Sequence, residues 1–294
     1  MTSSKQTHIR IYVCTFSTGK EVPASPEQSH YLIHVMRVSN FDRIYIFNEH
    51  MGEYEATIRV DKSSAYLRPA NCVRLPPTPA SEGGPRAPSD ACVEGARERW
   101  LAFCPIKPHL THFVVEKATE LGVSHILLLS SQRTQHSANV AKLRKVAIEA
   151  AEQCNRLTVP VVVHDSVRLE DFAREHPGDH GSTRLDDCAL PGENGSTRLD
   201  DARALLGDNG STRLEDARAR PWGHIRWFAA LERCESAPLL SFKGDDSVGV
   251  IIGPEGGFTP EERDLLARHA TPVSLGENIL RSETAAICAL SRLL

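Results

Sequence analysis

Short stretches of alternating apolar and polar residues dominate the beginning of the chain. They lie at residues 9–13, 43–47 and 54–60. Alternation with a period of two is typical of half-buried strands, so the pattern predicts a small β-domain over residues 1–74. One helix interrupts it, because Ser25 stands as a cap before Pro26, a residue suited to the first helical position, and the apolar run 30–38 follows.

A second pattern, in which apolar strands alternate with longer helices, follows a proline-rich segment. Residues 75–90 hold five prolines and two glycines, which can neither complete a strand ladder nor sustain a helix, so we take residues 75–92 as a linker. Beyond it the pattern predicts strands at 100–104, 125–129 and 159–163, and helices at 110–121 and 139–154. Strands separated by such helices predict an α/β domain with a parallel sheet over residues 93–294, with ligand sites at the carboxyl ends of the strands.

Within the helix at 139–154 we expect the buried face to consist of Ala141, Val146, Ile148 and Ala151. Further along, residues 224–232 fit either a helix or a strand. Residues 247–252 have the pattern of a short buried strand.

Four related six-residue segments lie between these two parts of the sheet. SVRLED, STRLDD, STRLDD and STRLED begin at Ser166, Ser182, Ser196 and Ser211. Their spacing is shorter than that of solenoid repeats, and each copy offers only leucine and alanine to bury. We therefore interpret residues 166–220 as a duplicated surface insertion with short capped turns, and a binding repeat is the alternative.

Composition narrows the function classes. The 294 residues are 40% hydrophobic and 24% charged, and no apolar run approaches the roughly 20 residues that span a bilayer. Residues 1–20 lack the apolar block of a signal peptide, so we expect a cytoplasmic protein without a membrane span. The eight cysteines are never closer than twelve residues apart, which gives no zinc-ligand spacing. We expect reduced thiols and no metal, with disulfide pairing as the less favoured alternative.

Charge is unevenly distributed along the chain, whose formal net charge is -4. Residues 1–164 carry 19 Lys and Arg against 15 Asp and Glu, whereas residues 165–220 carry 8 against 13 and residues 221–294 carry 7 against 10. A basic N-terminal half can meet phosphates. The excess is small beside that of dedicated nucleic-acid binders, so charge alone leaves the partner open.

The segment after the predicted strand 247–252 carries the first candidate site. Residues 253–258 read GPEGGF, and Thr259, Pro260 and Glu262 together form a complete helix start. Three glycines within five residues let the backbone approach a ligand closely. The segment matches neither a dinucleotide fingerprint nor a P-loop. We interpret it as a ligand loop, and a tight strand-to-helix turn is the alternative.

Residues 273–286 form the second candidate segment, predicted as a short strand, a loop and the start of a final apolar helix. Arg281 and Glu283 sit where that helix begins, and Ser282 or Thr284 can cap it. A guanidinium and a carboxylate are thus expected at the mouth of the sheet. Mutual pairing of Arg281 and Glu283 is the alternative.

Five motifs occur together and in a fixed order. They are EKATELGV at 116–123, SQRTQ at 131–135, AAEQCNR at 150–156, IGPEGGFTPEE at 252–262 and LGENILRSETAA at 275–286. In this order they resemble the RsmE-type family of SPOUT-class enzymes, which methylate N3 of a uridine in 16S (small-subunit) ribosomal RNA with S-adenosylmethionine. The resemblance covers the chain except residues 75–92 and the repeat insertion. Asn278 departs from it, because many members have arginine there.

The resemblance implies a PUA-like RNA-binding β-barrel at residues 1–74 and a SPOUT domain at 93–294. The latter is a knotted parallel sheet with helices on both faces, and it forms a homodimer across the knot. S-adenosylmethionine lies in the knot, held largely by main-chain groups. The cofactor-binding residues expected from the family are Leu129, Ile252, Gly253, Glu255, Gly256, Leu275, Gly276, Ile279 and Leu280.

On this resemblance we hypothesise that Arg281 neutralises the uracil anion and that Glu283 orients Arg281 or helps the N3 proton leave. The expected partner is small-subunit ribosomal RNA or the assembled subunit. Candidates for phosphate contacts are Arg10, Arg37, Lys107 and Arg156, and each is alternatively a solvated surface cation. Two other functions stay open: a SPOUT methyltransferase acting on another RNA, and a non-enzymatic RNA-binding assembly factor.

Overall fold

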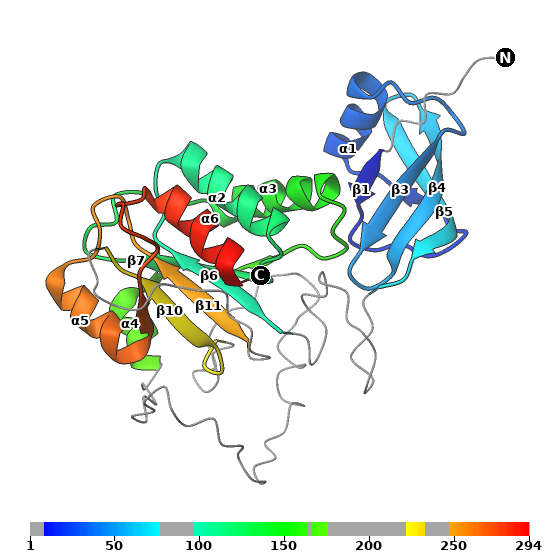
Figure 1. Cartoon of the computed structure of the whole chain (residues 1–294). Coiled ribbons are helices and arrows are strands. Elements are labelled where there is room, and N and C mark those ends of the chain that lie inside the picture. Colours follow the sequence, from blue (N-terminus) through cyan, green and yellow to red (C-terminus); the bar gives the residue numbers. More distant parts are fainter. Residues whose placement is uncertain (1–8, 77–96, 164–165, 176–221, 233–246, 294) are drawn as a thin grey trace, which may run out of the picture. The chain divides into compact units, whose positions relative to one another are not determined.

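The computed structural model describes residues 9–76, 97–163, 166–175, 222–232 and 247–293. The chain divides into two compact units (Figure 1). The first comprises residues 1–99, 112–124 and 141–161, and the second comprises residues 100–111, 125–140 and 162–294. The first unit therefore includes segments far along the chain from the N-terminal β-domain. The predicted linker lies largely outside the described residues, so its boundaries stay a prediction.

A five-stranded sheet forms the N-terminal part of the first unit. Its strands run in the order β1-β3-β4-β5-β2, with β3, β4 and β5 in antiparallel succession and β1 parallel to β3. Their bounds are β1 Arg10–Tyr12, β2 Val22–Pro23, β3 Arg43–Asn48, β4 Gly52–Asp61 and β5 Ser64–Arg74. The inward residues of these strands bury a common core that includes Ile11, Ile44, Ile46, Ile58 and Leu67. The predicted β-domain is confirmed.

The predicted helix of this domain is also confirmed. Helix α1 (Pro26–His30) begins with a complete capping box, in which the Ser25 hydroxyl accepts the backbone N–H of Gln28 and the Gln28 side chain accepts that of Ser25. Its continuation, Tyr31–Val35, is a π-helical turn (η1) that the sequence pattern did not predict.

Two longer helices follow the β-domain, α2 (Pro108–Glu120) and α3 (Val140–Gln153). On α3 the buried side chains are Leu143, Ala147, Ala150 and Ala151. Of the predicted face, Ala151 is buried and Ile148 is partly buried against the same core cluster, whereas Ala141 is exposed, so the prediction was wrong in part. Leu143, Ala147, Ala150 and Ala151 follow the spacing that places side chains on one stripe of a helix, whereas the predicted set mixes spacings of five, two and three.

The second unit is built on a sheet of seven strands, in the order β12-β10-β11-β6-β7-β8, with β9 also paired to β7. The pairs β10–β11, β10–β12, β6–β7 and β7–β9 are all parallel, as predicted. The bounds are β6 Arg99–Phe103, β7 His125–Ser130, β8 Val161–Val162, β9 Val167–Arg168, β10 Arg226–Ala230, β11 Val248–Ile252 and β12 Thr271–Val273. The segment 224–232, for which helix and strand both fitted, contains strand β10.

The first of the four repeat copies belongs to this sheet rather than to a surface insertion. Its residues form β9 and the start of helix α4 (Leu169–Glu175), where Leu169 and Phe172 are fully buried. The prediction that the insertion begins at residue 166 was therefore wrong, because a buried leucine and phenylalanine tie this copy to the core. The copies that begin at Ser182, Ser196 and Ser211 lie outside the described residues.

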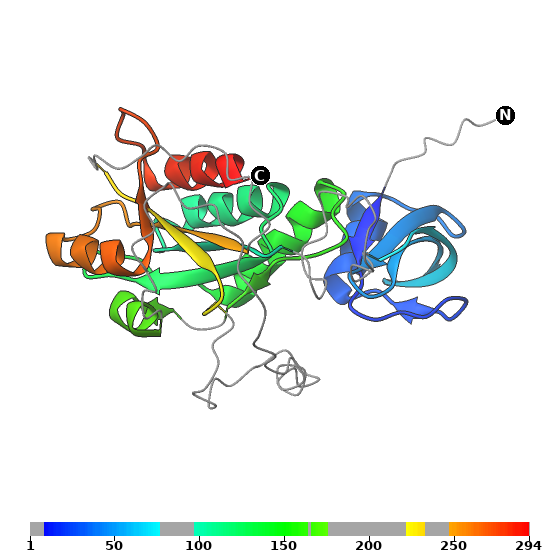
Figure 2. The same ribbon diagram turned by 60° about the horizontal axis from the view of Figure 1, so that its bottom comes forward.

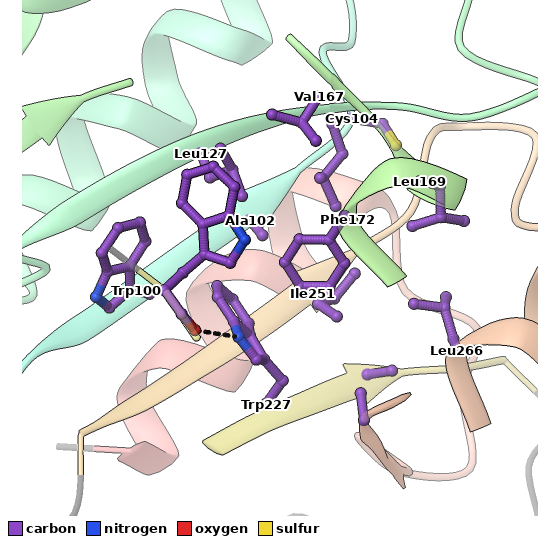
Figure 3. Close-up of a cluster of buried hydrophobic side chains, with 14 of the residues drawn as sticks. Trp100, Ala102, Cys104, Leu127, Val167, Leu169, Phe172, Trp227, Ile251 and Leu266 are labelled. Carbon is purple, nitrogen blue, oxygen red and sulfur yellow. Dashed lines mark hydrogen bonds between the residues drawn. The ribbon is translucent and has the colours of Figure 1, made fainter. Parts of the chain in front are cut away.

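Helices cover both faces of this sheet (Figures 1 and 2). Helix α6 (Ser282–Leu293) packs on β11 at one face, and α4 lies at the opposite face. Helix α5 (Pro260–His269) shares the core on the α4 side, where Phe172 meets the ring of Trp227 edge-on at 5.1 Å between centroids (Figure 3). This core includes Trp227 and Ala229 of β10 and Ile251 of β11.

Candidate functional site

A cavity of about 630 Å³ opens where β10, β11 and β12 end. Three loops surround it, at residues 230–232, 252–258 and 274–280, and the first residues of α6 complete the wall. The carboxyl ends of parallel strands meet at one edge of a sheet, which is where binding sites of open α/β sheets lie. A cavity of this volume is large enough for a small-molecule ligand.

Seven of the nine expected cofactor-binding residues line this cavity: Ile252, Gly253, Gly256, Leu275, Gly276, Ile279 and Leu280. The other two do not. Leu129 is fully buried within the core cluster beneath the site, because β7 directs it into the sheet interior. Glu255 is exposed and stands outside the cavity wall. The cavity therefore does not include Leu129 and Glu255, and their assignment to the cofactor stays a prediction.

Two of the three glycines of the 253–258 loop are required by its geometry. Gly257 has a φ of +64°, a left-handed conformation that favours glycine, and its N–H bonds to the Pro254 carbonyl at 2.9 Å. At Gly253 a Cβ would lie 3.0 Å from the Phe258 ring. Gly256 has no positive φ, and a Cβ there would meet only the Arg133 side chain at 3.5 Å. Close approach at Gly253 and left-handed backbone at Gly257 therefore shape the loop.

A buried carboxylate connects this loop to a second one. Glu262 is 2% exposed, and one of its oxygens accepts the N–H of Thr259 at 2.9 Å, in the predicted capping box. Its other oxygen accepts the N–H of Gln132 at 2.7 Å, in the loop that follows β7. The helix-start signal revealed the first bond. No sequence signal gave the second, because its partners are 130 residues apart.

Arg133 forms a second link between the same two loops. Its Nη1 donates to the Gly256 carbonyl at 2.8 Å, and its side chain lines the cavity. Arg133 belongs to the SQRTQ motif, but its part in the site was not predicted. Arg263 and Glu232 also line the cavity, and Arg263 donates to the Glu232 carbonyl at 2.5 Å. Charges of both signs thus face the cavity.

The loop 274–280 is held from the last helix. Arg292 of α6 donates to the Leu275 carbonyl at 3.2 Å, and Gly276 adopts a φ of +135°. The Ser274 hydroxyl both donates to the Gly276 carbonyl and accepts its N–H, each at 3.3 Å. This loop therefore presents backbone groups and the apolar side chains of Leu275 and Leu280 to the cavity.

Helix α6 begins at Ser282, so Arg281 occupies the capping position and its carbonyl accepts the N–H of Ala285 at 2.8 Å. The prediction that Ser282 or Thr284 caps this helix was wrong, because both lie inside its first turn. Arg281 is exposed and Glu283 is half-buried, and neither lines the cavity, although Leu280 and Ser282 do. The two side chains thus sit at the rim. Among the described residues no hydrogen bond or ion pair joins Arg281 to Glu283.

Two of the four arginines and lysines expected to contact phosphate are buried. Arg10 bonds the Glu53 carboxylate through Nε and donates to the carbonyls of Ala151 at 2.7 Å and Arg156 at 2.6 Å. Its guanidinium also lies 3.5 Å above the Phe47 ring. Each of the three guanidinium nitrogens of Arg10 donates to a partner within the protein, so its assignment as a phosphate contact was wrong.

Arg156 is likewise a structural residue. Its Nη1 donates to the carbonyls of Thr119 at 2.6 Å and Val123 at 3.0 Å, and its Nη2 donates to the Thr158 hydroxyl at 3.0 Å. Arg156 is 6% exposed and was wrongly expected to meet RNA. Arg37 and Lys107 are exposed, and their assignment stays a prediction.

The buried thiol of Cys104 has a raised pKa. Burial raises the pKa of Cys104 more than its neighbours Thr134 and Ser131 lower it, so it stays protonated near neutral pH.

Among the described residues no cluster of His, Cys, Asp and Glu could hold a metal ion. No helix in the described part of the chain is long and apolar enough to cross a membrane.

Comparison with known proteins agrees with this geometry. A family model described as an RNA methyltransferase domain matches residues 94–206 and 224–294, and one described as an RNA methyltransferase PUA domain matches residues 25–70. The chain is 26% identical over 276 residues to the ribosomal RNA small subunit methyltransferase E of Rickettsia conorii, covering 92% of this chain and 87% of the relative.

Solved structures share the fold. A putative methyltransferase from Legionella pneumophila, in complex with the bound cofactor SAM, superposes with a TM-score of 0.65 at 26% identity and covers 97% of this chain and 96% of its own. The ribosomal RNA small subunit methyltransferase E of Neisseria gonorrhoeae, bound to S-adenosyl methionine, superposes with a TM-score of 0.64 at 19% identity, covering 97% and 95%.

Proposed function

The chain belongs to the RNA methyltransferase family, and from this premise we propose that it methylates N3 of a uridine in small-subunit ribosomal RNA, using S-adenosylmethionine. The observation that carries the proposal is the cavity at the ends of β10, β11 and β12. Two of the five family motifs, at 252–262 and 275–286, form most of its wall. A third motif contributes Arg133.

The cavity fits S-adenosylmethionine in its chemistry. Adenine can be recognised by main-chain N–H and C=O groups, and the loops 252–258 and 274–280 present such groups beside apolar side chains. The carboxylate and ammonium of the cofactor find charges of both signs at Arg133, Arg263 and Glu232. Gly253 has no side chain. The Phe258 ring would lie 3.0 Å from a Cβ at this position, so a larger residue would not fit beside it without a shift of the ring. When bound, the cofactor supplies an electrophilic methyl group on a sulfonium.

The residues at the rim are suited to the other half of the reaction. Uracil N3 must lose its proton, and the resulting negative charge spreads over the two flanking carbonyl oxygens. Arg281, next to the cavity-lining Leu280 and Ser282, neutralises that charge, and Glu283 orients Arg281 or takes up the proton. Arg281 is exposed at the rim, so this role requires the bound RNA to exclude water from it; an aimed cationic donor in a water-poor site is worth ~3 kcal/mol of transition-state stabilisation. The target base has to be unpaired or flipped, because N3 lies inside a Watson–Crick pair.

We also propose that the chain acts as a homodimer in the cytoplasm, with the C-terminal segment knotted as in the family. The final helix is apolar and rich in alanine, and Ile279 at the cavity wall is 56% exposed. A partner copy would cover such a side chain. Light scattering at micromolar concentration tests the dimer, and a monomer would contradict it.

The experiment that tests the function uses small subunits from a strain in which the gene is deleted. Purified protein and S-adenosylmethionine are added to these subunits and to naked 16S RNA, and methylated nucleotides are mapped by mass spectrometry. A single N3-methylated uridine is expected. Methylation at another position or in another RNA class would contradict this function and indicate a SPOUT methyltransferase with a different RNA target.

Calorimetry with S-adenosylmethionine separates catalysis from an assembly role. Arg281→Ala is expected to bind the cofactor like the wild type and to lose at least about 100-fold in turnover, in line with ~3 kcal/mol. Absence of cofactor binding by the wild-type protein would indicate the non-enzymatic assembly factor. Normal turnover of Arg281→Ala would remove Arg281 from the catalytic set.

A further inference from the structure

The turn between η1 and β3 carries two residues in an unfavourable backbone conformation. Arg37 has a φ of +54° and Phe41 a φ of +71°, the left-handed region that glycine adopts at little cost. For other residues this conformation costs on the order of 1 kcal/mol or more. Such residues persist in a fold where the surrounding structure enforces them, and they often mark functional positions.

Burial of the Phe41 side chain does not compensate for the cost of its backbone conformation. Its side chain is 82% exposed, the most exposed of the large apolar residues in the described part of the chain. A buried phenyl ring stabilises a protein by removing apolar area from water, and Phe41 does not do this. Its position therefore combines a strained backbone with an unburied aromatic ring.

The turn that presents Phe41 is held firmly. The Phe41 N–H donates to the Ile58 carbonyl at 2.8 Å, and the Asp42 N–H donates to the Ser39 carbonyl at 3.1 Å. The Asp42 carboxylate accepts the Ser39 N–H at 2.7 Å, and the Asn40 side chain accepts the N–H of Val60 at 2.6 Å. These bonds fix the turn against β4, so the ring stands on a preorganised support.

The chemistry around Phe41 suits a nucleotide. Residues 31–41 contain no acidic residue, and the carboxylate of Asp42, which follows Phe41, accepts the Ser39 N–H at 2.7 Å within the turn. Arg37 is exposed in the same turn. Four residues span at most about 14 Å, so Arg37 and Phe41 can contact neighbouring nucleotides of one strand. Aromatic rings stack on unpaired bases, and arginine binds phosphate. The segment also lies within residues 25–70, which match the RNA methyltransferase PUA domain.

We propose that Phe41 is a stacking platform for an unpaired base of the substrate RNA and that Arg37 binds a phosphate beside it. This site rests on the proposed function, because it assumes an RNA substrate. It lies in the first unit and is built from residues that the cofactor cavity does not use. It assigns the β-domain a direct part in choosing single-stranded RNA.

The test compares stability with RNA affinity in the full-length protein. Phe41→Gly relieves the strained φ and is expected to raise the melting temperature. The same substitution removes the ring and is expected to weaken binding of 16S RNA between about 5-fold and about 150-fold, the range found for one stacked base. Lys62, with a φ of +54° in the turn between β4 and β5, is the backbone control. Lys62→Gly is expected to raise stability in the same way.

Three further variants separate stacking from other contacts. Phe41→Trp keeps a stacking face and is expected to retain affinity, whereas Phe41→Leu keeps apolar bulk without a face and is expected to bind as weakly as Phe41→Gly. Arg37→Gln is expected to lower the slope of binding against salt concentration by about one, and the Phe41 variants are expected to leave it unchanged.

The outcomes also distinguish this site from the proposed function. Wild-type protein that neither binds S-adenosylmethionine nor methylates RNA would overturn the function. Wild-type methylation with unchanged KM for RNA in Phe41→Gly would overturn the stacking site alone. Full affinity of Phe41→Leu, or a defect seen only on assembled subunits while naked RNA binds normally, would also overturn it and indicate a protein contact.

Discussion

Replacing Glu262 with glutamine tests whether one buried carboxylate holds two loops of the site together. Its two oxygens accept the N–H groups of Thr259 and Gln132, at 2.9 and 2.7 Å. Glutamine offers one oxygen and an amide NH2, so one of the two N–H groups loses its acceptor in a position that is only 2% exposed. A hydrogen bond to a charged group is worth about 1.5–3 kcal/mol. We expect the free energy of unfolding to fall by that amount and the melting temperature by about 3–12 °C.

The same change is expected to weaken S-adenosylmethionine binding. The loop that Glu262 holds through Gln132 also contains Arg133, which lines the cavity, so loss of this bond lets Arg133 move. Calorimetric titration and thermal unfolding of the purified protein measure both effects. Glu261→Gln is the matched control, since Glu261 is an exposed carboxylate in the same helical turn. It removes the same charge and is expected to change either quantity little. Equal effects of the two variants would refute the role of the cross-loop bonds and reduce Glu262 to a source of helix-dipole stabilisation.

Three further predictions concern pH, backbone and a buried ion pair. Burial raises the pKa of Glu152 to about 7, so between about pH 4.5 and 7 the folded state keeps a proton that the unfolded state releases. The stability of the fold is therefore expected to fall as pH rises through this range. Thermal melts of Glu152→Gln are expected to show a weaker dependence on pH. Gly257→Ala is expected to cost ~1 kcal/mol because of its positive φ, whereas Gly256→Ala leaves chemical denaturation nearly unchanged; equal costs would show that φ is not the cause. Arg10→Ala leaves the buried Glu53 carboxylate with Arg74, at 3.7 Å, as its remaining ion-pair partner among the described residues, and is expected to destabilise the protein by ~3 kcal/mol, the lower end of the range for a broken buried pair; retention of the wild-type denaturation midpoint would contradict the buried pair.

Local signals predicted local structure well. Both predicted helix caps, Ser25 and Thr259, are confirmed, because the residues that form each cap lie within four positions of one another. Strands β6, β7, β8 and β11 were predicted by their apolar runs, whereas β9 was not, because it lies in the segment predicted to be an insertion. A ligand site was predicted at the carboxyl ends of the strands by a rule about parallel sheets. Segment 224–232 stayed ambiguous because a short buried strand and a buried helix both appear as an apolar run.

The errors concern contacts between distant segments. Arg10 was taken for a surface cation because its acceptors, the carbonyls of Ala151 and Arg156, lie more than 140 residues away. Arg156 was misread for the same reason. The left-handed conformation of Phe41 was likewise not predicted, because the residue type there argues against it and only the pairing with β4 enforces it. Charge and residue type alone do not show where a side chain finds its partners.

The buried bonds of Arg10 have a consequence for how the protein is made. Strand β1 leaves the ribosome before the other described strands, yet two of the acceptors for its arginine belong to residues 151 and 156, which are synthesised much later. Until those acceptors are available, burial of the guanidinium would cost free energy. Strand β1 is therefore expected to stay hydrated and unpaired with the sheet. An excised fragment that ends near residue 76 would never acquire those acceptors. The first strand is therefore among the last to be completed, and the N-terminal sheet should reach its final stability only after the middle of the chain has been translated.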